Sequence, residues 1–224
     1  MLVRDWMSKT VITADAEDSM QDAVRLLKDH GIKILPVLDH GKLAGIVTDR
    51  DLKRASASDA TTLEIHELVY LLSKIKIKEV MTPHPVTVSL DATIEEAAQA
   101  MLARKISGCP VVDPNGEVQG IITQNDLFRV IISFTGIDKK GIQIGLQTLD
   151  RPGAISYCLD MIRQQNGRIM SVLSSREQAP EGTLRIYIRA FDIEGDKLEA
   201  LKKEFQSKAD ILYLVDHQSG RRTL

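Results

Sequence analysis

The chain has 224 residues, of which 43% are hydrophobic, with 29 lysines and arginines against 31 aspartates and glutamates. This length suffices for one or two domains with buried cores, and the composition excludes a disordered chain, a collagen and a small disulfide scaffold. Residues 1–136 carry 15 basic and 19 acidic side chains, and residues 137–224 carry 14 and 12, so neither part has the basic stripe of a nucleic-acid-binding protein.

The sequence carries no sign of a membrane span, a secretion signal or a metal site. Its uninterrupted apolar runs reach about five residues, against the ~20 that a membrane helix needs. Residues 1–5 lack the apolar core of a signal peptide, which predicts a cytoplasmic protein without a membrane partner. Cys109 and Cys158 lie inside apolar segments, as buried core residues do, and the five histidines are scattered. Because the phosphate-binding and hydrolase motifs of enzymes do not occur, we expect neither catalysis nor a required cofactor.

An internal repeat organises the first part of the chain. Residues 4–39 are similar to residues 78–113 at an offset of 74 positions. After one inserted residue, Gly45 to Leu52 align with Gly120 to Leu127 at an offset of 75. Self-similarity of this kind indicates two copies of one supersecondary unit. Since a unit of about 60 residues has little core of its own, we expect the two copies to pack together.

Each repeat predicts the order strand, helix, strand, strand, helix. Apolar residues recur at helical spacing from Met20 to Leu27 and again from Ile94 to Met101. Two apolar strands follow in each copy, and a second helix begins at Thr48 or Thr123. The strands are expected at residues 34–38, 43–47, 109–112 and 118–122. Between the copies, we expect a polar loop over residues 56–62 and an inserted helix over residues 63–72.

The repeated element Gly-apolar-apolar-Thr-x-x-Asp lies where a strand ends and a helix begins, at Thr48 to Asp51 and at Thr123 to Asp126. One interpretation is structural, because Thr at the N-cap and Asp at the third helical position form a capping box. The other is functional, because helix N-terminal amides and a Thr hydroxyl bind phosphate, while a nearby carboxylate accepts both hydrogens of a ribose diol. Two copies at the same place in two units favour a nucleotide site.

These motifs resemble CBS (cystathionine-β-synthase) motifs. The resemblance includes Trp6-Met7-Ser8 and Pro36-Val37 ahead of the first motif and residues 106–113 ahead of the second. Tandem CBS motifs form a Bateman module with two clefts. The resemblance implies that the clefts bind adenosine-containing ligands such as AMP, ATP, NAD or S-adenosylmethionine.

Carried over to this chain, the resemblance implies ribose at Asp51 and Asp126 and phosphate at Thr48 and Thr123. The implied adenine-lining residues are Ile46, Ile106, Ser107, Gly108, Pro110 and Ile121.

The two copies differ beside these residues. Arg50 of the first copy aligns with Asn125 of the second. Arg50 can pair with a phosphate bidentately, whereas Asn125 brings no charge, so we expect the first site to suit a multiply phosphorylated ligand better. The alternative for Arg50 is a surface arginine that pairs with Asp49 or Asp51. Lys33 stands where Ser107 stands in the second copy, which alters the first adenine slot.

From about residue 137 the pattern changes to the order βαββαβ, the ferredoxin-like split arrangement. Strands are expected at residues 142–148, 169–174, 183–191 and 211–215, with helices after Gly153 and around Leu201. Arg185 and Arg189 fall on the polar face of the third strand and are expected to face solvent or a partner chain.

The first strand–helix turn of this part, Asp150-Arg151-Pro152-Gly153, resembles that of the ACT domain, a small regulatory module that often binds amino acids between paired copies. The resemblance implies a ligand site at Asp150, Arg151, Pro152, Gly153, Ala154 and Ile155, where helix amides would receive a carboxylate. The alternative is that Pro and Gly simply make the turn.

We therefore expect an α+β protein with CBS motif 1 over residues 1–62, an inserted helix and linker over 63–76, CBS motif 2 over 77–136 and an ACT domain over 137–224. This arrangement is similar to the acetoin-utilisation type of CBS–ACT protein. The resemblance implies a homodimeric regulator of carbon metabolism that senses adenine nucleotides and acts on a protein partner. The alternative is a dimerisation and interaction scaffold whose clefts bind nothing.

Overall fold

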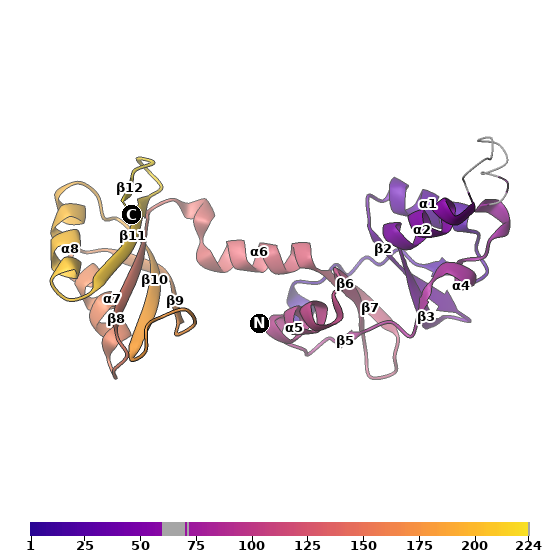
Figure 1. Cartoon of the computed structure of the whole chain (residues 1–224), viewed down its shortest axis with the longest axis horizontal. Coiled ribbons are helices and arrows are strands. Elements are labelled where there is room, and N and C mark those ends of the chain that lie inside the picture. The colour runs from indigo at the N-terminus through magenta and orange to yellow at the C-terminus, as the bar shows by residue number, and fades with distance from the viewer. Residues whose placement is uncertain (60–69, 71, 224) are drawn as a thin grey trace. The chain divides into compact units, whose positions relative to one another are not determined.

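The computed structural model describes residues 1–59, 70 and 72–223 (Figure 1). They divide into two compact units, Met1–Phe128 and Arg129–Leu224. The division falls inside a helix, α6 (Gln124–Thr135), ahead of the change of pattern at residue 137. The polar loop expected over residues 56–62 is wrong for residues 56–59, because helix α2 (Asp49–Asp59) continues through them. The helix expected over residues 63–72 lies almost entirely outside the described residues. None of the described helices is long and apolar enough to cross a membrane.

The first repeat has the predicted order of elements. They are β1 (Ala14–Asp15), α1 (Met20–Asp29), β2 (Ile34–Asp39), β3 (Lys42–Thr48) and α2 (Asp49–Asp59). Ser19 caps α1, because its hydroxyl accepts from Asp22 N at 3.1 Å while the Asp22 carboxylate accepts from Ser19 N at 3.3 Å. The apolar face of α1 packs with β2 and β3 in one buried cluster that includes Met20, Leu35 and Val47.

The second repeat follows the same plan. Its elements are α4 (Ile77–Val80), β4 (Thr82–Pro83), β5 (Val88–Ser89), α5 (Ile94–Arg104), β6 (Gly108–Val112), β7 (Val118–Thr123) and α6. Thr93 and Glu96 form the capping box of α5, at the positions equivalent to Ser19 and Asp22. In both repeats the short first strand runs parallel to the second strand, which pairs with the third antiparallel.

The segment ahead of each repeat pairs with the other repeat. Thr82 of β4 lies beside Ile46 of β3, so β4 completes the four-stranded sheet of the first repeat. Its counterpart Ser8 forms a bridge with Ile121 of β7, with hydrogen bonds of 2.9 and 3.0 Å between the two backbones. This reciprocal exchange explains why the two repeats form one compact unit.

The glycine of each repeated motif makes this exchange possible. A Cβ atom on Gly45 would lie 2.5 Å from the Met81 sulfur and 2.9 Å from the Thr82 carbonyl oxygen. A Cβ atom on Gly120 would overlap the Met7 sulfur and lie 3.0 Å from the Ser8 carbonyl oxygen. Each motif therefore carries glycine because the segment ahead of the other repeat crosses it closely.

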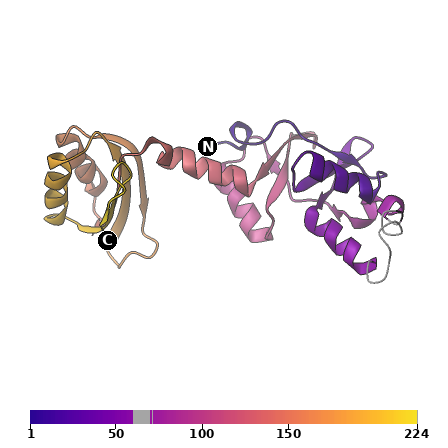
Figure 2. The same cartoon turned by 90° about the horizontal axis from the view of Figure 1, so that it is seen from above.

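The second unit has the order βαββαβ with one further strand. Its elements are β8 (Ile142–Leu149), α7 (Ala154–Gln164), β9 (Arg168–Ser175), β10 (Thr183–Phe191), α8 (Asp196–Gln206), β11 (Asp210–Asp216) and β12 (Arg222–Thr223), preceded by a 3₁₀ turn at Ile137–Lys139. The sheet is antiparallel throughout, in the order β12-β11-β8-β10-β9. Figures 1 and 2 show α7 and α8 on the same side of it.

Alternation along the central strands sorts the residues between the two sheet faces. Ile186 and Ile188 of β10 pack with Ile144 of β8, Ile162 of α7 and Phe205 of α8 in the core of this unit. Cys109 of the first unit and Cys158 of the second are buried, as predicted.

Arg189 was expected to face solvent or a partner chain, and the expectation that it faces solvent is wrong. Arg189 does lie on the sheet face opposite the helices, but it is only 3% exposed, because its guanidinium reaches back to Gln143 and to the backbone of Lys140. Arg185, two pleats away on the same strand, is half-buried.

Candidate nucleotide site

Thr48 ends β3, and Asp51 lies in the first turn of α2. Oδ2 of Asp51 accepts hydrogen bonds from Thr48 N at 3.0 Å and Thr48 Oγ1 at 2.6 Å, and Thr48 Oγ1 accepts from Asp51 N at 3.3 Å. Asp51 is 8% exposed. A carboxylate of this kind at a helix N-terminus is stabilised by the amides and the dipole of the helix.

The second copy repeats this geometry where β7 leads into α6. Oδ2 of Asp126 accepts from Thr123 N at 2.7 Å and from Thr123 Oγ1 at 2.6 Å, and Asp126 is 4% exposed. Both copies therefore contain the Thr-to-Asp bonds of the capping arrangement, and the first also has the reciprocal bond from Asp51 N to Thr48 Oγ1, so the structural interpretation of the motif is supported in each. The functional interpretation then depends on what acceptor capacity the carboxylates keep.

Asp51 keeps little of that capacity. An ionised carboxylate offers about four lone-pair sites. Thr48 uses two of them on Oδ2, and Arg54 Nη2 uses a third on Oδ1 at 2.9 Å. To accept both hydroxyls of a ribose diol, Asp51 would have to release Arg54, whose side chain is 71% exposed.

The pairing of Arg50 with Asp49 or Asp51, the alternative considered for this arginine, is absent from the described part of the chain. Asp49 pairs instead with Lys53 at 2.7 Å, and Asp51 with Arg54. Arg50 itself is exposed at the start of α2. The sequence pattern did not single out Arg54, although its position three residues after Asp51 is a helical ion-pair spacing.

The segments expected to line the adenine slots lie against these helix starts. The Lys33 carbonyl accepts from Asp49 N at 3.4 Å, and the Ser107 carbonyl accepts from Gln124 N at 2.9 Å. Gln124 Nε2 also donates to the Ile106 carbonyl at 3.3 Å. The backbone therefore brings residues 106–107 to the second site and Lys33 to the first, while the Ser107 side chain stays exposed.

The remaining candidates lie inside the paired strands. Ile46 and Pro110 are buried, and Ile121 is half-buried beside Pro110 in the β6–β7 register. A Cβ atom on Gly108 would lie 2.7 Å from Cδ1 of Ile34, its counterpart in the first repeat. Ile34 and Gly108 thus meet where the repeats face each other, and only one of the two can carry a side chain.

In the second unit, the six residues Asp150 to Ile155 all line one open pocket of about 430 Å³, together with Ser156, Arg176 and Leu184. Gly153 precedes α7 with a φ of 86°, and no side chain caps the helix. Arg176 holds Asp150 through two hydrogen bonds, of 2.6 Å from Nε and 3.0 Å from Nη2. This pairing raises the pKa of Arg176. Arg176 follows β9 and had no sequence signal.

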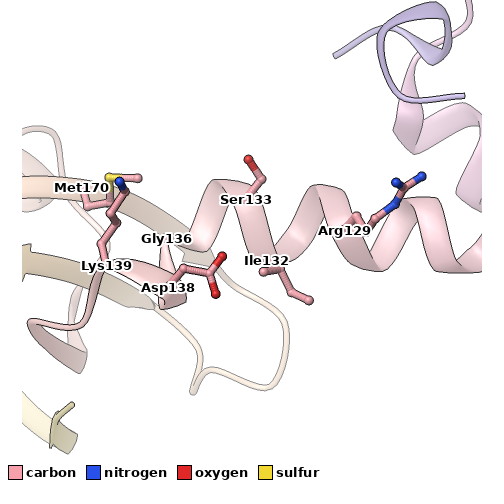
Figure 3. Close-up of a pocket in the computed structure, with 7 residues that line it drawn as sticks. All are labelled: Arg129, Ile132, Ser133, Gly136, Asp138, Lys139 and Met170. Atoms are coloured by element: carbon pink, nitrogen blue, oxygen red, sulfur yellow. The ribbon is translucent and has the colours of Figure 1, made fainter. Parts of the chain in front are cut away.

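A second pocket of about 410 Å³ lies where α6 ends, and Figure 3 shows the residues that line it. They are Arg129, Ile132, Ser133, Gly136, Asp138, Lys139 and Met170. Gly136 has a φ of 65°, and a Cβ atom there would lie 2.6 Å from Met170 Cγ. The methionine therefore packs directly on the glycine that ends the helix. None of these residues was a candidate from the sequence.

Known proteins share the two repeats described above. The CBS-domain family model matches residues 3–58 and 77–133, which are the two repeats. The chain belongs to the CBS-domain family. A CBS domain-containing protein of Dictyostelium discoideum is 33% identical over 133 residues, which cover 59% of this chain and 92% of that protein. Inosine-5'-monophosphate dehydrogenase of Korarchaeum cryptofilum is 38% identical over 160 residues, 69% of this chain but only 30% of the enzyme.

Solved structures show the same CBS pair. The CBS domain pair of protein MJ0100, in complex with 5'-methylthioadenosine and S-adenosyl-L-methionine, has a TM-score of 0.51 and 36% identity, covering 58% of this chain and 95% of that one. A putative acetoin utilization protein (AcuB) from Vibrio cholerae has a TM-score of 0.51 and 28% identity, covering 62% of this chain and 98% of that one. The family model ends at residue 133, ahead of β8.

Proposed function

We propose that the CBS pair binds adenosine-containing ligands and that the chain is a regulatory sensor without catalytic activity of its own. The observation that carries the proposal is the Thr–Asp pair with a buried aspartate at the start of a helix in both repeats. The MJ0100 pair, 36% identical, binds two adenosine-containing compounds in its crystal structure. In this chain, ribose would bind at Asp51 or Asp126, with phosphate at the amides of the same helix.

The two sites differ in charge, which predicts different ligands. Lys33 and Arg50 of the first repeat align with Ser107 and Asn125 of the second, whereas Arg54 aligns with Arg129 and does not differ. Guanidinium groups bind phosphate through charge-assisted hydrogen bonds. The first site would therefore favour ATP, and the second would favour ligands with fewer phosphates.

Thermal unfolding with AMP, ATP, NAD and S-adenosylmethionine tests the proposal. A ligand at 100 times its dissociation constant stabilises the native state by about 2.7 kcal/mol. Asp51→Asn should abolish most of the ATP effect, and Asp126→Asn should remove the effect of the less phosphorylated ligands. Asp49→Asn is the matched control, because Asp49 lies on the same helix but is exposed and paired with Lys53. If none of the four compounds raises the melting temperature of the wild type, the scaffold alternative replaces the sensor.

We further propose that residues 137–224, which lie within the second unit, form an ACT domain and that its pocket at Asp150 to Ile155 takes an amino acid. Its βαββαβ order and the convergence of all six candidate residues on one pocket support this assignment. The uncapped start of α7 would receive the ligand's carboxylate. Single amino acids in the same thermal panel test this part. The acetoin-utilisation role, the homodimer and a regulated protein partner belong to the same proposal, supported by the likeness to AcuB over the CBS pair.

A further inference from the structure

A buried arginine on the open face of the second unit's sheet has an incomplete set of partners. Arg189 donates to Gln143 Oε1 from Nη2 at 2.9 Å and to the Lys140 carbonyl from Nη1 at 3.5 Å. Its Nε is buried and has no hydrogen-bond partner among the described residues. The whole residue is 3% exposed. Buried polar groups are almost always hydrogen-bonded, so this Nε calls for an explanation.

The charge of Arg189 is also uncompensated. In the part of the chain that the structure describes, no carboxylate forms an ion pair with it, and its two acceptors are a neutral amide and a backbone carbonyl. Burial lowers the pKa of its guanidinium. Burial, together with the charges of Arg189 and Arg222, also lowers the pKa of His217, which lies 3.5 Å from Gln143 Oε1. A buried cation without a counter-ion is costly.

We propose that this face of the sheet binds a small organic anion, through a carboxylate or phosphate group that takes the place of Gln143 Oε1 against Arg189. One oxygen of the anion would accept from Arg189 Nη2 and a second from the unpartnered Nε, and the group would face His217. It would replace a neutral acceptor by one of opposite charge to the guanidinium, and carboxylates and phosphates can accept two parallel N–H bonds from one arginine. All residues of the site belong to the second unit, so the proposal does not rest on nucleotide binding to the CBS repeats.

The surroundings of Gln143 give such a ligand access and a surface for its carbon skeleton. Gln143 accepts from the guanidinium, and Tyr213 and His217 interact with it electrostatically; all three are half-buried and so reach the surface. The Gln143 amide donates to Tyr213 Oη at 3.1 Å, so it is held by side chains alone and can swing away. Beside it, the rings of Tyr187 and Tyr213 are stacked, with their centroids 6.2 Å apart. Both tyrosines pair with Gly145 of β8, where a Cβ atom would lie 2.6 Å from the Tyr213 ring.

A set of substitutions tests the proposal in the full chain. Gln143→Glu places a carboxylate where the anion would bind, Arg189→Met removes the anchor, and Gln147→Glu is the matched control. Gln147 lies on the same strand and face, where it accepts from Arg185 at 3.5 Å, but Arg185 is not buried. The probes are sodium acetate and inorganic phosphate, each against sodium chloride at equal ionic strength. The readouts are the melting temperature and the Nε–H resonance of Arg189 in nitrogen-15 NMR spectra.

We expect acetate, phosphate or both to raise the wild-type melting temperature and to shift the Arg189 Nε–H resonance; the effective probe identifies the anionic group. Without added anion, Gln143→Glu should have a higher melting temperature than the wild type. Gln143→Glu and Arg189→Met should both lose the rise in melting temperature on adding the anion. Gln147→Glu should keep it. Phosphate bound at the CBS pair is distinguished by Asp51→Asn and Asp126→Asn, which should leave the Arg189 shift intact. The proposal fails if neither probe moves the resonance, or if Arg189→Met responds as the wild type does.

Discussion

At the scale of a single residue, burial alone alters the chemistry of Cys109. This residue lies in β6 and is 0% exposed, with Val111 of the same strand equally buried. Burial raises the pKa of its thiol from 9.0 to about 11, because the thiolate would have to leave water. The same cause raises the pKa of Cys158. Both thiols are therefore poor nucleophiles in the folded protein.

The raised pKa predicts a loss of stability in alkali. The unfolded thiol ionises near pH 9 and the folded one near 11, so the folded state binds this proton more tightly. The stability linked to the proton is fully present below about pH 9 and is lost as pH rises toward 11, by about 2.7 kcal/mol for two pKa units. Urea unfolding of the wild type and of Cys109→Ala across this range should show their stability difference shrinking. A constant difference would contradict the assignment.

At the scale of one element, the start of α2 has two roles that can be separated. Thr48 caps the helix through its hydroxyl and holds Asp51 in place with the same atom. The cap operates without any ligand, whereas a phosphate-binding role would require one. A substitution that removes only the hydroxyl therefore measures the cap first and the ligand contact second.

Thr48→Ala should lower the free energy of unfolding by about 1 kcal/mol without ligand, which is the usual cost of losing an N-cap side chain. Thr48→Ser retains the hydroxyl and should be close to the wild type. Chemical denaturation measures both variants, and repeating it with ATP shows whether the hydroxyl also contacts the ligand. Equal stability of Thr48→Ala and Thr48→Ser would show that the 2.6 Å bond to Asp51 contributes nothing.

At the scale of the CBS pair as a whole, stability depends on the exchange of segments between repeats. The segment that carries Trp6, the single tryptophan, crosses Gly120 of the second repeat. A change at Gly120 therefore acts on a contact between residues more than one hundred positions apart, and the fluorescence of Trp6 reports it directly.

Gly120→Ala should destabilise the CBS pair by about 1–3 kcal/mol, the usual cost of overpacking, because the new Cβ would meet both the Met7 side chain and the Ser8 backbone. Urea unfolding followed by Trp6 fluorescence should show an earlier midpoint. The amide signal of Ile186, in the core of the second unit, should keep its own midpoint. Adding Met7→Ala should recover part of the loss, and an unchanged Trp6 midpoint in Gly120→Ala would refute the close crossing.

Much of the local structure was predictable. The alternation of Leu184, Ile186, Ile188 and Ala190 predicted a strand over residues 183–191, and β10 has these bounds. The helical spacing from Met20 and from Ile94 likewise predicted α1 and α5. These signals are local, since the side-chain period of a strand or helix is written into the sequence itself. The Thr–Asp hydrogen bonds follow from the same short spacing.

The contacts between distant parts of the chain were not predictable in this way. The sequence indicated the repeat, its caps and a family resemblance that the CBS-domain match confirms. It contained no signal that β4 joins the sheet of the first repeat, that Arg176 holds Asp150, or that Arg189 is buried. Each of these depends on which segments the fold brings together. Local spacing is set by the covalent chain, whereas burial and long-range pairing exist only once the strands have packed. Packing therefore decides which charged groups are desolvated.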